Sequence, residues 1–119
     1  MNRLLLFPLA LIAAPAGAAM TTGTFVAKAN ALRANPLTAI TSPDFALLRD
    51  EARTATAQLR AERDARRAAG KPPIACVPEG QSIGITDMLD GLAALPPALQ
   101  KRPLKDGYAA VLAKRFPCR

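Results

Sequence analysis

The sequence predicts a small all-α protein, a four-helix domain with one long amphipathic helix and one disulfide. Apolar residues recur at the three- and four-residue spacing of amphipathic helices, and alanine is abundant throughout the chain. Strands are not indicated, because no run of alternating β-branched residues occurs. With 119 residues, the chain is long enough for one domain only.

Residues 1–19 have the pattern of a secretory signal peptide. Arg3 supplies a positive charge, residues 4–14 form an apolar run interrupted only by Pro8, and residues 16–19 are small. The apolar run is too short to cross a bilayer, which takes ~20 residues. We therefore expect cleavage near Ala19 and a single mature domain over residues 20–119, periplasmic or secreted, with no stable membrane anchor. A true start at Met20 stays open as the alternative.

The mature chain would be basic. Removing residues 1–19 leaves 100 residues with 15 Lys and Arg against 9 Asp and Glu, a net charge of +6. Such a charge favours anionic partners, whether acidic proteins, lipid head groups or cell-wall polymers.

A first helix is expected over residues 25–34. Thr24 is suited to cap its N-terminus, and the Asn35-Pro36 pair ends it. Residues 37–40 are expected to form a short helical turn.

The second helix has the clearest start signal in the chain. Ser42 is a good N-cap, Pro43 suits the first helical position, and Asp44 favours the positive helix end. We expect this helix to run to about Ala69 and to end at Gly70. One apolar stripe should face the core: Phe45, Leu48, Ala52, Ala55 and Leu59.

Beyond Leu59 the second helix should leave the core and project into water, because charged residues continue the stripe. The basic face expected there comprises Arg60, Arg63, Arg66, Arg67 and Lys71. A solvated surface is the simplest interpretation of these charges, and contact with nucleic acid is the alternative.

A third helix is expected over residues 86–94, with a start as early as Ser82 left open. Its buried face comprises Ile85, Met88, Leu89 and Leu92, and Leu95-Pro96-Pro97 ends it. A fourth helix follows Pro103 and ends at Pro117. Its apolar residues at helical spacing are Leu104, Tyr108, Val111, Leu112 and Phe116.

Cys76 and Cys118 are the only cysteines. A domain this small usually needs a covalent staple, and export would make a disulfide between them chemically reasonable. Closing a loop of about 43 residues should contribute roughly 4 kcal/mol of stability in the chain-entropy model. A redox or metal role is the alternative, but two cysteines without histidine cannot complete a zinc site.

Catalysis is difficult to build from these residues, so we expect no enzyme, no cofactor and no metal. The chain has no histidine, and its only serines are Ser42, a helix cap, and Ser82, which has no base nearby in the sequence. Asp87 and Asp90 could share a proton or bind a cation, but they also suit a wet face near a positive helix end. Gly80 and Gly84 lack the lysine and hydroxyl residue of a phosphate loop.

Nucleic acid is not an expected partner either. The mature aromatic residues occupy core-type positions, so no stacking platform is indicated. The third and fourth helices are separated by too long a turn for a helix-turn-helix motif.

The stretch from Cys76 to Cys118 resembles the C-terminal half of the type VI secretion amidase immunity proteins of the Tai type. It matches at Cys76-Val77-Pro78-Glu79-Gly80, at an apolar helix over 83–95, at the proline break after Leu95 and at Phe116-Pro117-Cys118. The resemblance implies a small exported helical protein that binds and blocks a peptidoglycan amidase effector. The family's central-helix cysteine and Tyr-x-x-Gly pattern have no counterpart, so only Cys76 and Cys118 carry over, as a disulfide.

These observations lead to a non-catalytic exported binding protein that resembles an amidase inhibitor. Its candidate partner-binding residues lie in the proline-stiffened connection from 95 to 103: Leu95, Pro96, Pro97, Gln100, Lys101 and Arg102. A basic envelope protein that binds cell-wall or lipid anions through charge is the alternative, and a small stress protein without a fixed partner is a third hypothesis. The oligomeric state stays open.

Overall fold

The computed structural model describes residues 19–119, and in this range it contains six helices and no strand. They are α1 (Thr22–Ala34), α2 (Pro36–Ala39), α3 (Pro43–Ala68), α4 (Ile85–Ala93), α5 (Pro97–Gln100) and α6 (Leu104–Arg115). The all-α fold, the single long helix and the Cys76–Cys118 disulfide are thus confirmed. The four expected helices correspond to α1, α3, α4 and α6, and α2 is the short helical turn expected near residues 37–40. Helix α5 was not predicted.

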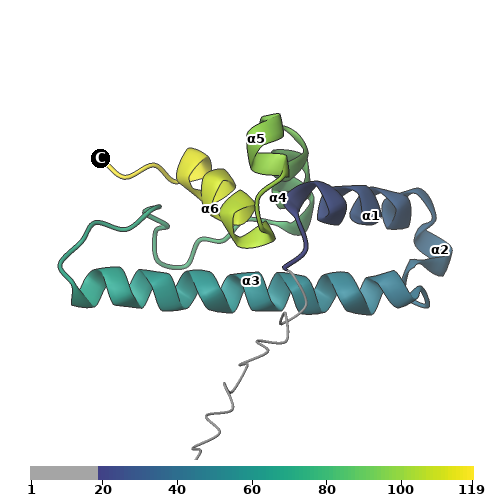
Figure 1. Cartoon of the computed structure of the whole chain (residues 1–119), viewed down its shortest axis with the longest axis horizontal. Coiled ribbons are helices and arrows are strands. Elements are labelled where there is room, and N and C mark those ends of the chain that lie inside the picture. Colours follow the sequence, from purple (N-terminus) through teal and green to yellow (C-terminus); the bar gives the residue numbers. More distant parts are fainter. Residues whose placement is uncertain (1–18) are drawn as a thin grey trace, which may run out of the picture.

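The helices form two layers. The long α3 makes one layer, and α1, α4, α5 and α6 lie across the other (Figure 1). Helix α3 contacts α1 near its N-terminal half and α6 near its C-terminal half, while α4 packs between α1 and α6. The segment of residues 69–84 leaves the far end of α3 and returns above it to α4.

The starts of α1 and α3 are both capped by hydroxyl groups. Ser42 accepts a hydrogen bond from the Asp44 amide, as predicted, and Pro43 occupies the first turn. The prediction of Thr24 as the α1 cap was wrong, because Thr21 holds that position and its hydroxyl accepts from the Thr24 amide. Helix α1 therefore begins at Thr22, three residues before the expected start at residue 25.

Helix α3 ends at Ala68, close to the predicted Ala69, and Gly70 follows with a φ of 68°, in the left-handed region that glycine adopts without strain. Its second half does not simply project into water. Lys105 of α6 pairs with Glu62, and α6 lies above this half of the helix. Most residues from 60 to 70 are exposed, as expected, and only the side that carries Glu62 and Arg66 is partly covered, by α6 and the returning segment.

Eight buried apolar residues form the core, two from each of the four longer helices. They are Phe25, Ala29, Leu48, Ala55, Met88, Leu92, Leu104 and Val111. Ile85 was predicted to join them, but its side chain is 81% exposed. It stands in the first turn of α4, beyond the part of that helix that packs on α1 and α6. Phe45, at the start of the α3 stripe, is also left 39% exposed.

The expected signal peptide, residues 1–19, lies outside the described residues except for Ala19. Between residues 19 and 119, no helix combines the length and the apolar character needed to span a bilayer.

Candidate functional site

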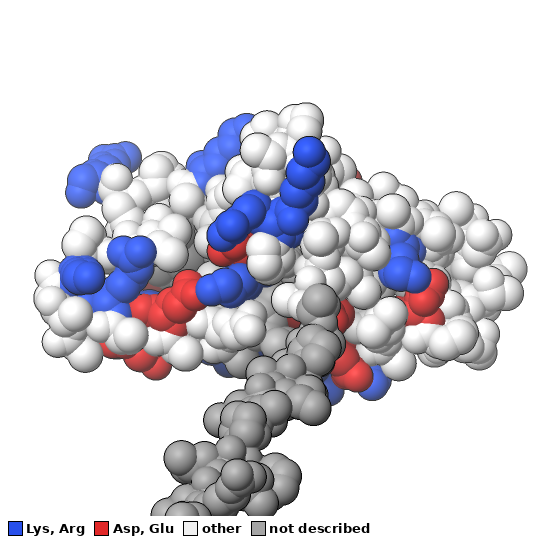
Figure 2. Space-filling view, viewed as in Figure 1, with Lys and Arg blue, Asp and Glu red and all other residues white. Residues whose placement is uncertain are grey.

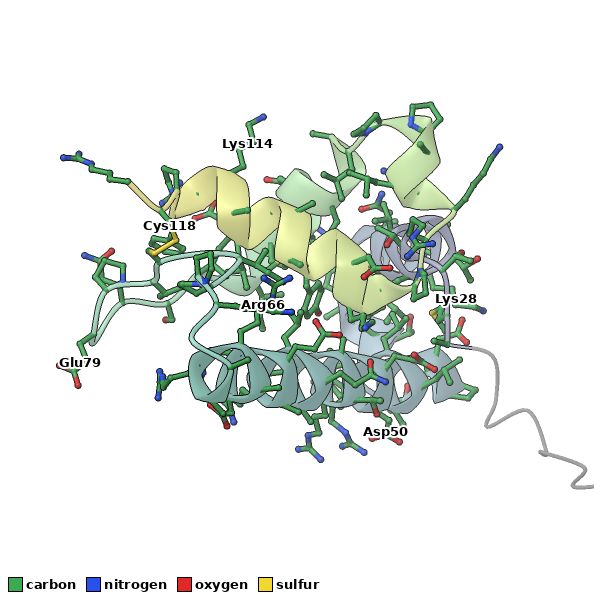
Figure 3. All side chains as sticks on the ribbon, turned by 60° about the vertical axis from the view of Figure 1, so that its left-hand side comes forward. Lys28, Asp50, Arg66, Glu79, Lys114 and Cys118 are labelled. Carbon is green, nitrogen blue, oxygen red and sulfur yellow. A yellow bond between two sulfur atoms is a disulfide. The ribbon has the colours of Figure 1, made fainter. Side chains whose placement is uncertain are left out.

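The disulfide joins the returning segment to the end of α6. Cys76 and Cys118 have their Cα atoms 5.0 Å apart, and both residues are exposed (Figure 3). Beside it, the Cys76 amide donates a hydrogen bond of 2.9 Å to the carbonyl oxygen of Phe116. These two links fix residues 73–77 against the C-terminal end of α6. The disulfide is compatible with an oxidising compartment.

The connection of residues 95–103, here called the α5 turn, is exposed but firmly held. The side-chain nitrogen Nε2 of Gln100 donates to the carbonyl oxygens of Leu92 (2.7 Å) and Leu95 (3.1 Å), and so satisfies the C-terminal end of α4. Pro96 and Pro97 restrict the backbone on one side, and Pro103 forms an isolated bridge with Thr21 on the other. The turn is therefore pre-organised on an outer edge of the molecule (Figure 1).

The six residues predicted for partner binding divide into two groups. Leu95 packs against the core and Gln100 is occupied by the α4 carbonyls, so both support the turn. Pro96, Pro97, Lys101 and Arg102 are exposed and available to a partner.

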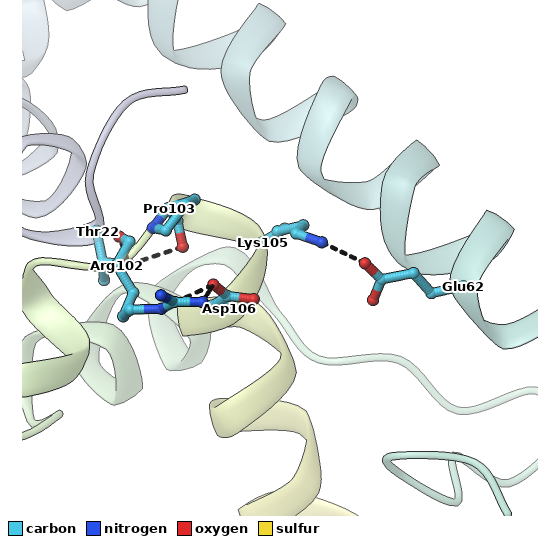
Figure 4. Close-up of polar contacts among 6 residues, drawn as sticks. All are labelled: Thr22, Glu62, Arg102, Pro103, Lys105 and Asp106. Carbon is cyan, nitrogen blue, oxygen red and sulfur yellow. Dashed lines mark hydrogen bonds and ion pairs between the residues drawn. The ribbon is translucent and has the colours of Figure 1, made fainter. Parts of the chain in front are cut away.

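Two polar contacts tie the α5 turn and the start of α6 to other helices, and a third joins the turn to α6 (Figure 4). Buried Thr22 donates its hydroxyl to the Arg102 carbonyl at 3.1 Å. The Arg102 guanidinium pairs with Asp106 at 2.9 Å, one turn along. Lys105 reaches Glu62 on α3, and the hydrogen bond with this carboxylate raises the pKa of the lysine above its ordinary value.

The residues of the predicted basic face do not act as one surface. Arg63 pairs with neighbouring Asp64 at 3.3 Å, whereas Arg66 lies between α3 and the returning segment and donates to the Pro72 carbonyl (Figure 3). Arg60, Arg67 and Lys71 are exposed and form no ion pair with any residue between 19 and 119. On the face shown in Figure 2, basic side chains lie over α5, α6 and the end of α3, while the part over α1 and α2 is mostly uncharged.

A groove of about 1200 Å³ runs along α3, beneath the returning segment and the edges of α1, α4 and α6. This α3 groove is lined by apolar side chains, among them Leu59, Ile74 and Phe116, and by arginines of α3. Tyr108 also lines it, in edge-to-face contact with Phe25 at a ring-centroid distance of 6.2 Å, and burial raises the pKa of the phenol.

Sequence reasoning missed this groove. Its one sequence signal is a second row on α3, beside the apolar stripe, in which arginines recur at positions 49, 53, 60 and 63. These four side chains line the groove, so the row marks one of its walls.

The remaining polar candidates are separated from one another. Asp90 pairs with Arg33 at 3.2 Å, whereas Asp87 stands in the first turn of α4. Ser82 is exposed at the edge of the groove. In the described part of the chain, no three His, Cys, Asp or Glu side chains come together to hold a metal ion.

No protein-family model, no curated protein and no solved structure matches this chain. The resemblance to the Tai-type immunity proteins therefore depends on the motifs between Cys76 and Cys118 alone.

Proposed function

We propose that this chain is an exported, non-catalytic protein that binds another protein and blocks it, with a peptidoglycan amidase as the target class. The amidase target comes from the motifs shared with the Tai-type family. The exported location comes from the signal-like pattern of residues 1–19 and agrees with the exposed disulfide.

The α5 turn is the observation that supports inhibition. Its exposed residues are held by anchors on both sides, namely half-buried Gln100 against the end of α4 and buried Thr22 against the Arg102 carbonyl. A protrusion that is ordered before binding loses little conformational entropy when it enters a cleft. Lys101, which forms no ion pair among residues 19–119, adds positive charge at its base, whereas Arg102 is paired with Asp106. This charge would steer the turn toward an acidic surface.

The test uses the exported protein immobilised and exposed to envelope extract, with release of peptides from purified peptidoglycan as the readout. The wild-type chain should retain an amidase and lower its activity. Ala98→Arg places a bulky side chain on the exposed α5 helix and should abolish both effects. Ala46→Arg makes the same change at an exposed site on α3, outside the groove, and should leave both intact.

Two results would overturn inhibition: recovery of no peptidoglycan hydrolase by the wild-type chain, or equal activity of the two arginine variants. Stability of both variants is checked by thermal unfolding, so that a loss of fold is not mistaken for a loss of contact.

A second function, charge-driven binding of envelope anions, is favoured by Arg60, Arg67 and Lys71, which are exposed and unpaired within residues 19–119. Salt separates the two functions. Binding to vesicles that contain phosphatidylglycerol should be strong at about 50 mM salt and lost by about 300 mM, whereas a packed protein interface should survive that change.

A further inference from the structure

The α3 groove leaves apolar side chains uncovered. Seven large apolar residues are exposed in the described part of the chain, and four of them line this groove: Phe45, Ile74, Val77 and Ile85. Exposed apolar side chains along a groove are typical of interaction sites, because covering them removes apolar area from water.

Positive charge is spread along the same groove. Arg49, Arg53, Arg60 and Arg63 line it at spacings of four, seven and three residues, so they share one side of α3. The first and last are 14 residues apart, about 21 Å along the helix axis. Arg53 and Arg60 are exposed and have no ion-pair partner among residues 19–119, so their guanidinium groups are free to bind carboxylates.

We propose that the α3 groove binds an acidic amphipathic helix of another protein. The helix would place an apolar stripe on Ile74, Val77 and Ile85 and direct carboxylates at the arginine row. About 14 residues, or four turns, match the length of the row. Anchors at three- and four-residue spacing are the usual way in which a helix occupies a groove.

The distribution of charge argues against other occupants. A second copy of this basic chain would bring a like arginine row toward the first, which is unfavourable. A single acyl chain carries its charge at one end, whereas these cations extend over about 21 Å. Nucleic acid would leave the apolar wall uncovered, since few aromatic side chains are present for stacking.

This interaction is separate from inhibition through the α5 turn. None of residues 95–103 lines the groove. A variant in one surface therefore leaves the other unchanged, and either proposal can fail alone.

The experiment measures binding of the exported chain to a fluorescent synthetic helix of about 16 residues, with leucines at three- and four-residue spacing and glutamates flanking them. Arg53→Glu/Arg60→Glu should weaken binding at least about tenfold, since two attractive charges become repulsive. Lys114→Glu/Arg119→Glu changes the net charge equally, outside the groove, and should stay within about twofold of wild type. Lys114 points away from α3 (Figure 3).

An uncharged substitution tests the apolar wall of the same site. Ile85→Gln, at a position already 81% exposed, should keep the fold and weaken binding of the glutamate peptide. Amide shifts on titration should concentrate at Val77, Ile85 and residues 53–60. A peptide with lysine in place of glutamate should not bind.

Four results would each overturn the proposal. The first would be failure of the glutamate peptide to bind the wild-type chain. The second would be an equal loss of affinity in both double charge variants, which would mean that net charge alone drives the binding. A third such result would be a dimer in sedimentation that Ile85→Gln abolishes, which would place a second copy in the groove. The fourth would be binding of dodecyl phosphate that is lost in Arg53→Glu/Arg60→Glu, while the peptide does not bind. That result would assign the groove to an anionic lipid.

Discussion

Thr22 and Gly107 meet where the start of α1 crosses the first turns of α6. Thr22 is fully buried, and its hydroxyl donates to the Arg102 carbonyl. A Cβ atom on Gly107 would lie 2.5 Å from Thr22 Oγ1, 2.8 Å from Thr22 Cγ2 and 3.1 Å from Leu92 Cδ2. The absence of a side chain at position 107 therefore sets how closely the two helices approach.

Gly107→Ala should destabilise the protein, although alanine is the better helix former. Alanine gains about 0.5–1 kcal/mol in helix propensity, but overlap with the immobilised Thr22 costs about 1–3 kcal/mol. Urea unfolding measures the difference. Gly84→Ala is the control for an added methyl group without overlap, since no atom lies within 4 Å of it, and alanine at this N-cap should cost about 1 kcal/mol or less. A Gly107→Ala protein as stable as the control would show that the crossing relaxes.

Titration of Tyr108 should lower the free energy of unfolding at alkaline pH. Burial raises the pKa of its phenol above the ordinary value of 10.0, so the unfolded chain loses this proton at a lower pH than the folded chain. The unfolded state then binds fewer protons, and stability falls as pH rises from about 10 through the folded pKa. Lys105 acts in the same direction, because its hydrogen bond with Glu62 raises its pKa and is lost on deprotonation.

Tyr108→Phe should flatten this alkaline decline without abolishing it. The phenylalanine keeps the edge contact with Phe25 and has no proton to lose, while Lys105 still titrates. The free energy of unfolding, measured in urea from about pH 8 to about pH 11, gives the comparison. Identical slopes for both proteins would show that the phenol is solvated in the folded state.

At the scale of the elements, local chemistry predicted α3 well and the connections poorly. Ser42, Pro43 and Gly70 set the ends of α3 through their own backbone preferences, so both ends could be predicted. The α1 cap was misplaced because Thr21 and Thr24 are equally suitable locally, and the contact of residues 21–22 with residues 102–103 selects the earlier one. Helix α5 was missed because four residues give no periodicity.

The candidate sites show the same limit. The prolines predicted an exposed α5 turn. That the Gln100 side chain would hold this turn could not be predicted. The α3 groove exists because residues 71–84 return over α3 instead of continuing outward. Such a return depends on long-range contacts, above all the Cys76–Cys118 disulfide and the Cys76–Phe116 hydrogen bond.

Removal of the disulfide should be costly although both cysteines are exposed. Cys76→Ser/Cys118→Ser opens a loop with a sequence separation of 42, which contains α4, α5 and α6. We expect a loss of about 2–4 kcal/mol, since the reduced unfolded chain gains conformational entropy. Urea unfolding of the variant, and of the wild-type chain with a reductant, should give the same value. No loss in either case would show that the packing of α4 and α6 on α3 suffices.

For the whole molecule, the disulfide affects the two proposed surfaces differently. One wall of the α3 groove is formed by Ile74 and Val77, which flank Cys76 and lie in a segment without helical structure. The α5 turn is held instead by Gln100, Thr22 and Pro103, all remote from the sulfur atoms in the fold. Reduction should therefore loosen the groove while the turn stays ordered.

Cys76→Ser/Cys118→Ser should accordingly bind the glutamate peptide several-fold more weakly, because the wall that it contacts must first be ordered. The same variant should still retain an amidase through the α5 turn, provided that it is measured below its unfolding temperature. Hydrogen exchange supplies an independent check. The Cys76 amide, which donates to Phe116, should lose protection, and the Thr22 and Leu104 amides, which donate to Arg102 and Met20, should keep it. Equal loss of protection at both places would mean that the disulfide holds the whole fold together, and the two surfaces could not be separated by reduction.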